Sequence, residues 1–176
     1  NIDLPLVPTR HSVILLQRPD DVLAGHPAGC DTEHLVYFRP EGGSYWLIDN
    51  GNHEEIVNPN TYKAQPEMDY VQDVWHRMTN RVPNLANAKY FTGYSGLYTS
   101  TPDDHPIVDT CSQIEGLYLC SGFSGHGYKE SPAIGRIVSE LIQNGRGDYP
   151  DITPLKSDRF STGETNQLSY RFKVLA

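Results

Sequence analysis

The spacing of hydrophobic residues changes along the chain, and each change indicates a different element. Residues 11–17, 35–38 and 45–48 are rich in β-formers, and Pro40-Glu41-Gly42-Gly43 separates the last two stretches. This pattern predicts a strand followed by a β-hairpin. Between residues 66 and 82 the apolar residues recur every three or four positions, at Met68, Val71, Val74, Trp75 and Met78. That period predicts an amphipathic helix that turns Trp75 and its neighbours toward a core.

The second half of the chain predicts further strands and one more helix. Residues 89–98 are β-prone but interrupted by Gly93 and Gly96, and strand-like stretches follow at 106–109 and 116–121. Ser131-Pro132 has the residue types of a helix N-cap and first position, and an apolar face follows it at Ile134, Ile137, Val138, Leu141 and Ile142. Gly145 is expected to end this helix. Residues 147–176 show little periodicity, which predicts an irregular tail with one short strand near 168–174.

Together these elements predict an α+β fold with a mixed, largely antiparallel sheet and two main helices. Residues 1–146 are expected to form the structured part, and residues 147–176 a carboxy-terminal tail. The chain begins at Asn1 without a leader segment, so we expect a trimmed or processed piece of a longer protein.

Composition excludes some classes of function. Of the 176 residues 38% are hydrophobic and 20% are charged, which is typical of a globular domain. The net charge of −8 repels a phosphate backbone, so nucleic acid is not an expected partner. No apolar run approaches the roughly 20 residues that span a bilayer, and we expect a soluble, cytoplasmic protein. The three cysteines have no CxxC spacing and predict neither a disulfide framework nor a zinc site.

A glycine-rich segment lies between the strand at 116–121 and the last helix, and its sequence is Gly122-Phe123-Ser124-Gly125-His126-Gly127. Glycines allow positive φ and a close approach of the backbone, and a helix start presents unpaired N–H groups, so the segment suits an anionic ligand. The spacing is neither GxGxxG nor GxxxxGK[ST]. A tight strand-to-helix turn explains the glycines equally well.

Several motifs occur in a fixed order within residues 5–146. They are 37–43, Gly96-Leu97-Tyr98, Thr101-Pro102-Asp103, Pro106-Ile107-Val108, Gly116-Leu117-Tyr118, the glycine-rich segment, Lys129 and Ser131-Pro132-Ala133-Ile134-Gly135. This order resembles the carboxy-terminal half of the FAD-dependent amine oxidoreductases of the D-amino-acid oxidase superfamily, and most closely the sarcosine oxidase and dimethylglycine dehydrogenase branch. The resemblance implies the substrate-binding half of a two-domain FAD oxidoreductase, with the amino-terminal GxGxxG domain absent from this chain.

The resemblance also implies roles for individual residues. Gly122, Phe123, Ser124, Gly125, His126 and Gly127 would face the flavin ring. Lys129 would hold the substrate carboxylate, and Tyr98 and Tyr37 would line the substrate cavity. His126 would position the substrate, since hydride transfer from an amine needs an unprotonated amine more than a strong protein base. A solvated lysine and ordinary packing tyrosines are the alternatives that the sequence leaves open.

Departures from the family pattern refine these implications. Gly96 stands where sarcosine oxidases carry the cysteine that attaches the flavin, so non-covalent FAD is expected. Tyr98 stands where glycine and D-amino-acid oxidases place a carboxylate-binding arginine, which disfavours those specificities. The stretch 45–48 lacks the lysine that assists reaction with oxygen, so oxidase and dehydrogenase both stay open.

The implied function is the oxidation of a secondary or tertiary amino acid, such as sarcosine, dimethylglycine or proline, by hydride transfer to flavin N5. A non-catalytic assembly domain and the oxidase domain of a tRNA-modifying flavoprotein are the alternatives. Asp103, Asp104, His105 and Asp109 suggest a metal cluster. Pro102 and Pro106 and the absence of a second histidine nearby favour a capped turn instead, and no metal is expected.

Overall fold

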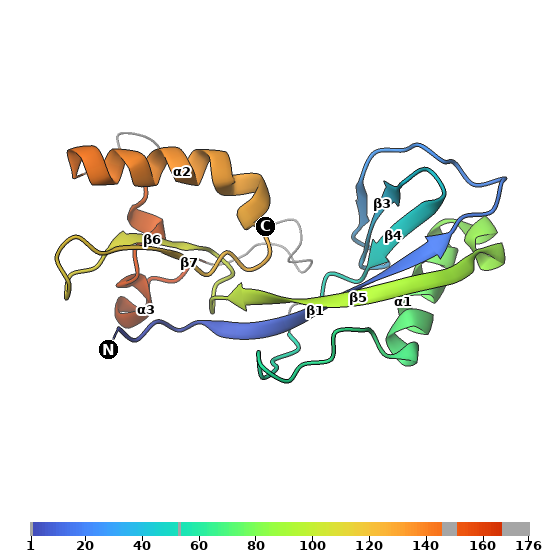
Figure 1. Cartoon of the computed structure of the whole chain (residues 1–176), viewed down its shortest axis with the longest axis horizontal. Coiled ribbons are helices and arrows are strands. Elements are labelled where there is room, and N and C mark those ends of the chain that lie inside the picture. Colours follow the sequence, from blue (N-terminus) through green and yellow to red (C-terminus); the bar gives the residue numbers. More distant parts are fainter. Residues whose placement is uncertain (1, 53, 146–150, 167–176) are drawn as a thin grey trace. The chain divides into compact units, whose positions relative to one another are not determined.

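The computed structural model describes residues 2–52, 54–145 and 151–166. The chain divides into two compact units. The first unit combines the amino-terminal residues up to Thr9 with the chain from Tyr98 onward, and the second unit covers Arg10–Leu97. The α+β class and the antiparallel pairing are confirmed, and the two main helices, α1 and α2, lie in different units (Figure 1).

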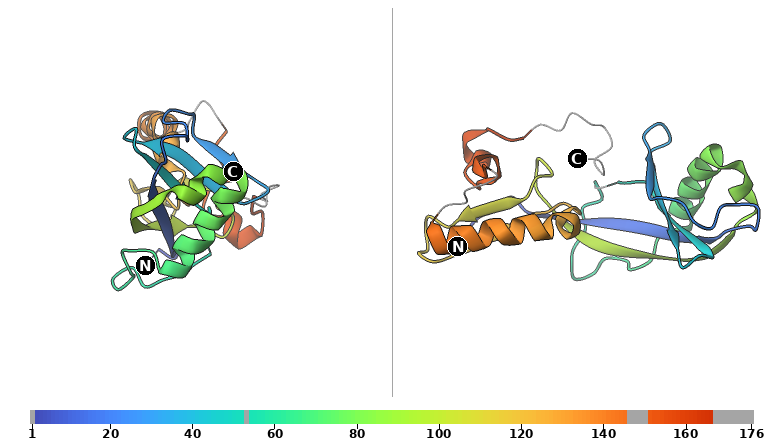
Figure 2. Two further views of the ribbon diagram at one scale, coloured as in Figure 1. Left: turned by 90° about the vertical axis from the view of Figure 1, so that its right-hand side faces the viewer. Right: turned by 90° about the horizontal axis from the view of Figure 1, so that it is seen from above.

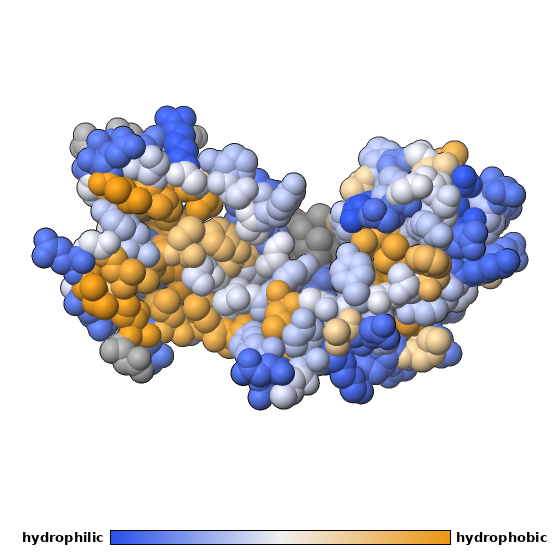
Figure 3. All heavy atoms as spheres, viewed as in Figure 1, coloured by the Kyte–Doolittle hydropathy of each residue, from blue (hydrophilic) through white to orange (hydrophobic). Residues whose placement is uncertain are grey.

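The first unit contains a two-stranded antiparallel sheet and the longer helix. Its strands are β6 (Ile107–Thr110) and β7 (Tyr118–Ser121), and its helices are α2 (Gly127–Asn144), the 3-10 turn η2 (Thr153–Leu155) and the short α3 (Arg159–Thr162). Ile134, Ile137 and Leu141 of α2 pack against Val108 of β6. In the ribbon of Figure 2, α2 runs beside the two-stranded sheet. On the face drawn in Figure 3, apolar side chains also gather at the surface around these strands.

The predicted helix in this unit agrees with α2 at its end but not over its whole apolar face. Gly145 ends the helix in the left-handed conformation, at φ 70°, as expected. Ile142, which the pattern places on the apolar face, is 57% exposed. The tail is more regular than expected, because η2 and α3 lie within residues 151–166, and the strand predicted near 168–174 falls outside the described residues.

The second unit contains most of a five-stranded sheet with one helix packed against it. Within the described residues the strand order is β2-β3-β4-β1-β5, with the bounds β1 Val7–Gln17, β2 Gly29–Asp31, β3 Val36–Glu41, β4 Tyr45–Asp49 and β5 Lys89–Ser100. The pairs β2–β3, β3–β4 and β1–β4 are antiparallel, and the arrowheads of β1 and β5 point in opposite directions in Figure 1. The expected hairpin is β3–β4, and its turn places Gly42 and Gly43 at positive φ.

Two predicted strands are longer in the structure than in the sequence pattern. β1 begins at Val7 and not at residue 11. β5 is continuous through both glycines, because Gly93 lets the strand approach its neighbours closely. A Cβ at Gly93 would lie 2.8 Å from the Val13 carbonyl oxygen and 2.6 Å from Pro66 Cγ, so this position tolerates no side chain.

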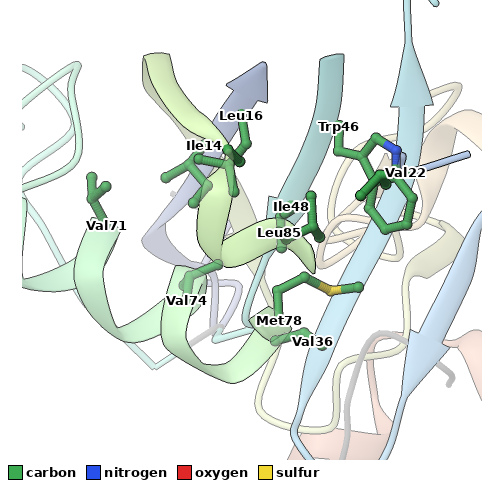
Figure 4. Packing of buried hydrophobic residues seen from close by; sticks show 11 residues of the cluster. Ile14, Leu16, Val22, Val36, Trp46, Ile48, Val71, Val74, Met78 and Leu85 are labelled. Carbon is green, nitrogen blue, oxygen red and sulfur yellow. The ribbon is translucent and has the colours of Figure 1, made fainter. Parts of the chain in front are cut away.

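The core of the second unit lies between the sheet and α1 (Met68–Arg81), as Figure 4 shows. The predicted stripe is correct for Val71, Val74 and Met78, which are buried in one cluster with the sheet. Met68, which the pattern also places on this stripe, is the first residue of α1 and is 58% exposed. Trp75 packs at the edge of this cluster and donates a hydrogen bond from Nε1 to the Leu85 carbonyl at 2.9 Å. Leu85 belongs to the 3-10 turn η1 (Pro83–Asn87) that follows α1.

A buried arginine fixes the segment before α1 to β1. Arg10 is 8% exposed and bonds Glu55 at 3.0 Å and Glu67 at 2.5 Å. The bond from Arg10, with a second from Lys63, lowers the pKa of Glu67 to about 2. The segment that carries both glutamates is therefore held at both ends by one cation.

Candidate functional site

The glycine-rich segment connects β7 to α2 through a backbone that has a positive φ at three positions. Gly122, Ser124 and Gly125 have φ values of 73°, 47° and 89°. Gly127 does not belong to this group, so the expectation of a positive φ there is wrong. Gly127 is instead the first residue of α2, and a Cβ on it would lie 3.0 Å from Phe123 Cγ. The need for glycine at this position is therefore steric.

Gly122 is required by its packing as well as by its φ. A Cβ at this position would lie 2.5 Å from Thr101 Cγ2 and 3.0 Å from Leu6 Cδ2. Ser124 is 1% exposed and also contacts Thr101. Its Oγ accepts a hydrogen bond from the Thr101 backbone N–H at 3.2 Å. The Ser124 N–H donates to the Thr99 carbonyl at 3.1 Å. The segment is thus held against the end of β5 and the residues just after it.

Gly125 lies directly against the ring of Tyr98. A Cβ on Gly125 would approach Tyr98 Cε2 to 2.6 Å and Cζ to 2.8 Å. Gly125 itself is exposed, whereas Tyr98 is half-buried. The structure therefore brings together two residues that the resemblance assigns to different ligands, the flavin and the substrate.

Replacing Gly125 by alanine is expected to destabilise the chain by at least about 2 kcal/mol, because strain at positive φ adds to overpacking against Tyr98. Gly116→Ala is the matched control. Gly116 also has a positive φ, 77°, but nothing lies within 4 Å of the position that a Cβ would take there. Urea unfolding should show a clearly smaller loss for Gly116→Ala, and equal losses would contradict the close packing of Tyr98.

The helix α2 begins five residues earlier than predicted. Its N-cap is His126, and Pro132 lies inside the helix, so the prediction of Ser131 as N-cap is wrong. Pro132 has no N–H to donate to the Tyr128 carbonyl. The Ser131 hydroxyl donates to that carbonyl instead, at 2.9 Å. This replacement explains how the helix continues through a Ser-Pro pair that more often marks a helix start.

The early start of α2 places its first turn at the end of the glycine-rich segment. No side-chain hydrogen bond from the N-cap residue covers the helix start. Lys129 lies in this first turn and is exposed, next to Glu130. The helix start presents N–H groups, and the Lys129 cation lies two residues after Gly127. Both features suit a negatively charged ligand. The residues present therefore fit the edge of a flavin that gains negative charge on reduction.

His126 is buried between the segment and the helix, with 8% of its surface exposed. The backbone N–H of His126 donates to the Phe123 carbonyl at 2.8 Å. Burial lowers the pKa of the His126 imidazole, and the charge of Lys129 lowers it further. The folded protein therefore holds this ring in its neutral form near pH 7.

The lowered pKa of His126 predicts a pH-dependent contribution to stability. In the unfolded chain the His126 imidazole takes up a proton near the ordinary histidine pKa of about 6.5. In the folded chain its pKa is lower, so the ring is protonated only at a lower pH. The free energy of unfolding should therefore fall as the pH drops below about 6.5, and His126→Gln should lack this part of the loss. Urea unfolding at several pH values measures both profiles. Parallel profiles for the chain and the variant would contradict the prediction.

Tyr37 belongs to the second unit, whereas the other predicted site residues all belong to the first. It lies on β3, which has a neighbouring strand on each side. Tyr37 is paired with Cys30 of β2 and with Asp49 of β4. Burial raises the pKa of its phenol. The structure does not bring Tyr37 together with the glycine-rich segment in one unit, and its assignment to the substrate cavity stays a prediction.

A buried ion pair that the sequence pattern does not indicate supports the segment. Arg159 bonds both carboxylate oxygens of Asp103, Nε to Oδ2 at 2.8 Å and Nη2 to Oδ1 at 3.0 Å. Asp103 also accepts a bond from Thr101 Oγ1 at 3.2 Å, and Thr101 packs on Gly122. The predicted capped turn is present, because the His105 N–H donates to Asp103 Oδ1 at 3.2 Å. Residue spacing cannot reveal the pair, since 56 positions separate its members.

Three features concern other classes of site. No group of three or more His, Cys, Asp or Glu side chains that could hold a metal ion occurs in the described ranges. None of the helices described has the length and hydrophobicity needed to span a bilayer. Cys30, Cys111 and Cys120 are free thiols, and Cys120 is exposed.

Comparison with known proteins shows the family to which the chain belongs. The family described as FAD dependent oxidoreductase, DAO, matches residues 1–141. The chain belongs to this family. It is 30% identical over 166 residues to FAD-dependent oxidoreductase domain-containing protein 1 of Bos taurus, covering 93% of this chain and 34% of that protein. It is 34% identical over 114 residues to peroxisomal sarcosine oxidase of Mus musculus, covering 65% of this chain and 28% of that protein.

A solved member of this fold is similar over nearly the whole chain. The crystal structure of L-proline dehydrogenase from P. horikoshii superposes with a TM-score of 0.80 at 24% identity, covering 94% of this chain and 43% of that one. Glycine oxidase from Geobacillus kaustophilus superposes with a TM-score of 0.72 at 21% identity, covering 90% and 40%. The chain thus has the fold of these two enzymes over the part that superposes. It spans about a third of the length of its curated relatives.

Proposed function

We propose that this chain is the substrate-domain part of an FAD-dependent oxidoreductase that oxidises a secondary or tertiary amino acid. The observation that carries the proposal is the juxtaposition of the glycine-rich segment, the start of α2 and Lys129 in one unit. Family membership supports FAD as the cofactor. The names of the relatives, sarcosine oxidase and L-proline dehydrogenase, support an N-substituted amino acid as the substrate class.

Each group of the site has a distinct task in this proposal. Bound FAD supplies the acceptor for the hydride that leaves the carbon next to the substrate nitrogen. The first N–H groups of α2 stabilise negative charge, a contribution of about 0.3–2 kcal/mol for a helix terminus. Lys129 binds the substrate carboxylate. His126, neutral because its pKa is lowered, adds no second positive charge beside Lys129 and leaves that cation to set the substrate's orientation.

We further propose that the flavin is held without a covalent bond and that another part of the parent protein binds its dinucleotide. Gly96 offers no sulfur, and nothing lies within 4 Å of the position that a Cβ would take there, so the backbone is open to a ligand. The apolar surface of the first unit in Figure 3 supports a covering partner, for which the amino-terminal half of the parent protein is our proposal.

The parent-length protein tests these proposals by its visible spectrum. Under anaerobic conditions, sarcosine, dimethylglycine or proline should bleach the flavin absorbance, and glycine should not. Acid precipitation of the same sample should release the flavin into the supernatant. A flavin-containing protein that none of the three N-substituted amino acids bleaches would contradict the substrate class. Colour retained in the washed pellet would contradict non-covalent binding.

A further inference from the structure

The second unit contains a cavity that the proposed function does not use. Its volume is about 600 Å³, which suits a small organic molecule. Phe38 and Trp46 form one wall, with their rings stacked at 5.6 Å and 9°. His26 lies against Trp46, with ring centroids 4.1 Å apart. Val82 and Pro83, which follow α1, belong to the lining as well.

The walls of this cavity are held in place by hydrogen bonds within the same unit. The loop between β1 and β2 supplies Val22 and Leu23, and Trp46 Nε1 donates to the Leu23 carbonyl at 3.1 Å. Arg18 Nη1 donates to the Val22 carbonyl at 2.8 Å. Figure 4 shows Val22 beside the indole of Trp46. Because these bonds already order the loop, a ligand would not have to organise its own site.

The charged residues at the cavity do not select an ionic ligand. Asp21 accepts a bond from Asn84 Nδ2 at 2.9 Å. Arg81 faces Asp31, with Nε 3.4 Å from Oδ2. The remaining lining is mainly apolar and aromatic, so the chemistry of the walls favours a neutral ligand with a planar ring.

His26 contributes the polar feature that defines the ligand further. Its Nδ1 lies 2.7 Å from the Pro27 carbonyl, which requires the proton on Nδ1 and leaves Nε2 as an acceptor. Nε2 is buried and has no hydrogen-bond partner among the described residues. An unpaired buried acceptor is costly, and a ligand that donates a hydrogen bond would remove that cost. The imidazole as a whole is half-buried, and ligand binding would require its ring to turn so that Nε2 faces the cavity.

We propose that this cavity binds a small neutral aromatic molecule carrying one hydrogen-bond donor, of the phenol or indole class. The ring packs against Trp46 and Phe38, and the donor bonds His26 Nε2. The site is independent of the glycine-rich segment, which lies in the other unit. Failure to bind such a molecule would therefore leave the proposed oxidoreductase function unaffected.

The test is a titration of the ¹⁵N-labelled chain with phenol, followed by NMR. The sequence has two tryptophans, and Trp75 does not line the cavity, so its indole signal is an internal control. Trp75→Phe assigns the two signals. Phenol should shift the Trp46 signal saturably and leave the Trp75 signal in place. Toluene, of nearly the same shape but without a donor, should bind about 3- to 10-fold more weakly.

The variant His26→Phe keeps a ring in the wall and removes the acceptor. It should bind toluene as before and lose the preference for phenol. Absence of a saturable shift of Trp46, or equal shifts of both tryptophans, would overturn the site. A preference for phenol that survives in His26→Phe would overturn the role of Nε2. If the variant does not fold, the comparison of phenol with toluene on the unsubstituted chain still tests the hydrogen bond. Equal affinities for the two compounds would refute it.

Discussion

Arg159→Met is expected to lower the free energy of unfolding by about 3–5 kcal/mol, because it leaves the carboxylate of Asp103 buried without its cation. The side chains of Arg159 and Asp103 are 3% and 2% exposed. Burial raises the pKa of Asp103, but the bonds from Arg159, Asn166 and His105 outweigh it, so this pKa lies below the ordinary value. The carboxylate is therefore charged at neutral pH, and methionine cannot compensate it. Urea unfolding measures the loss.

Two further variants show whether the loss comes from the unpaired charge. Arg136→Met removes an exposed ion pair with Glu140 on α2, and little change in stability is expected. The double variant Arg159→Met, Asp103→Leu removes both charges and should recover a large part of the loss. A double variant as unstable as the sum of the two single variants would show that the pair contributes through packing alone.

Lys129→Met in the parent-length protein is expected to reduce kcat/KM for proline or sarcosine about 10- to 150-fold, the equivalent of about 1.5–3 kcal/mol for a charge-assisted hydrogen bond. Methionine keeps the aliphatic stem and removes the charge. Because Lys129 is exposed on the first turn of α2, the fold should survive the change. Steady-state kinetics with the purified variant, together with its thermal unfolding, measures both effects.

The carboxylate itself supplies the decisive comparison. Pyrrolidine has the ring and the nitrogen of proline but no carboxylate, so Lys129→Met should affect its oxidation far less. Lys89→Met, at another exposed lysine, should leave both substrates unaffected. If Lys129→Met slowed proline and pyrrolidine equally, Lys129 would not bind the carboxylate, although the flavin proposal could still hold.

Local patterns in the sequence are sufficient for several elements. The prediction of α1 is correct because its stripe repeats with the helical period and Pro83 follows its end. The β3–β4 hairpin is correct because two strand-like stretches enclose a turn with two glycines. In each case the residues that determine the element are close together in the sequence.

The remaining features depend on contacts that local patterns do not contain. Ser131-Pro132 predicts the wrong start for α2, since nothing local shows that the Ser131 hydroxyl takes the place of the missing N–H. The helical turns of residues 151–166 have no clear period, and Arg159 of α3 is fixed by Asp103, which lies far away in the sequence. The closeness of Tyr98 to Gly125 likewise depends on how β5 passes the segment.

The Ser-Pro pair inside α2 has a mechanical consequence. At Pro132 the ladder of backbone hydrogen bonds lacks one member, and a side-chain hydroxyl replaces it. The turn before it carries Lys129, whereas the body after it is secured by Ile134 and Ile137 in the core. We therefore expect the first turn to open more readily than the body of the helix, so its amides should exchange with solvent faster. If the proposed flavin lies at this helix start, the first turn of α2 is the part of the helix that can adjust to a change in the flavin's charge, while the core residues hold the rest in place.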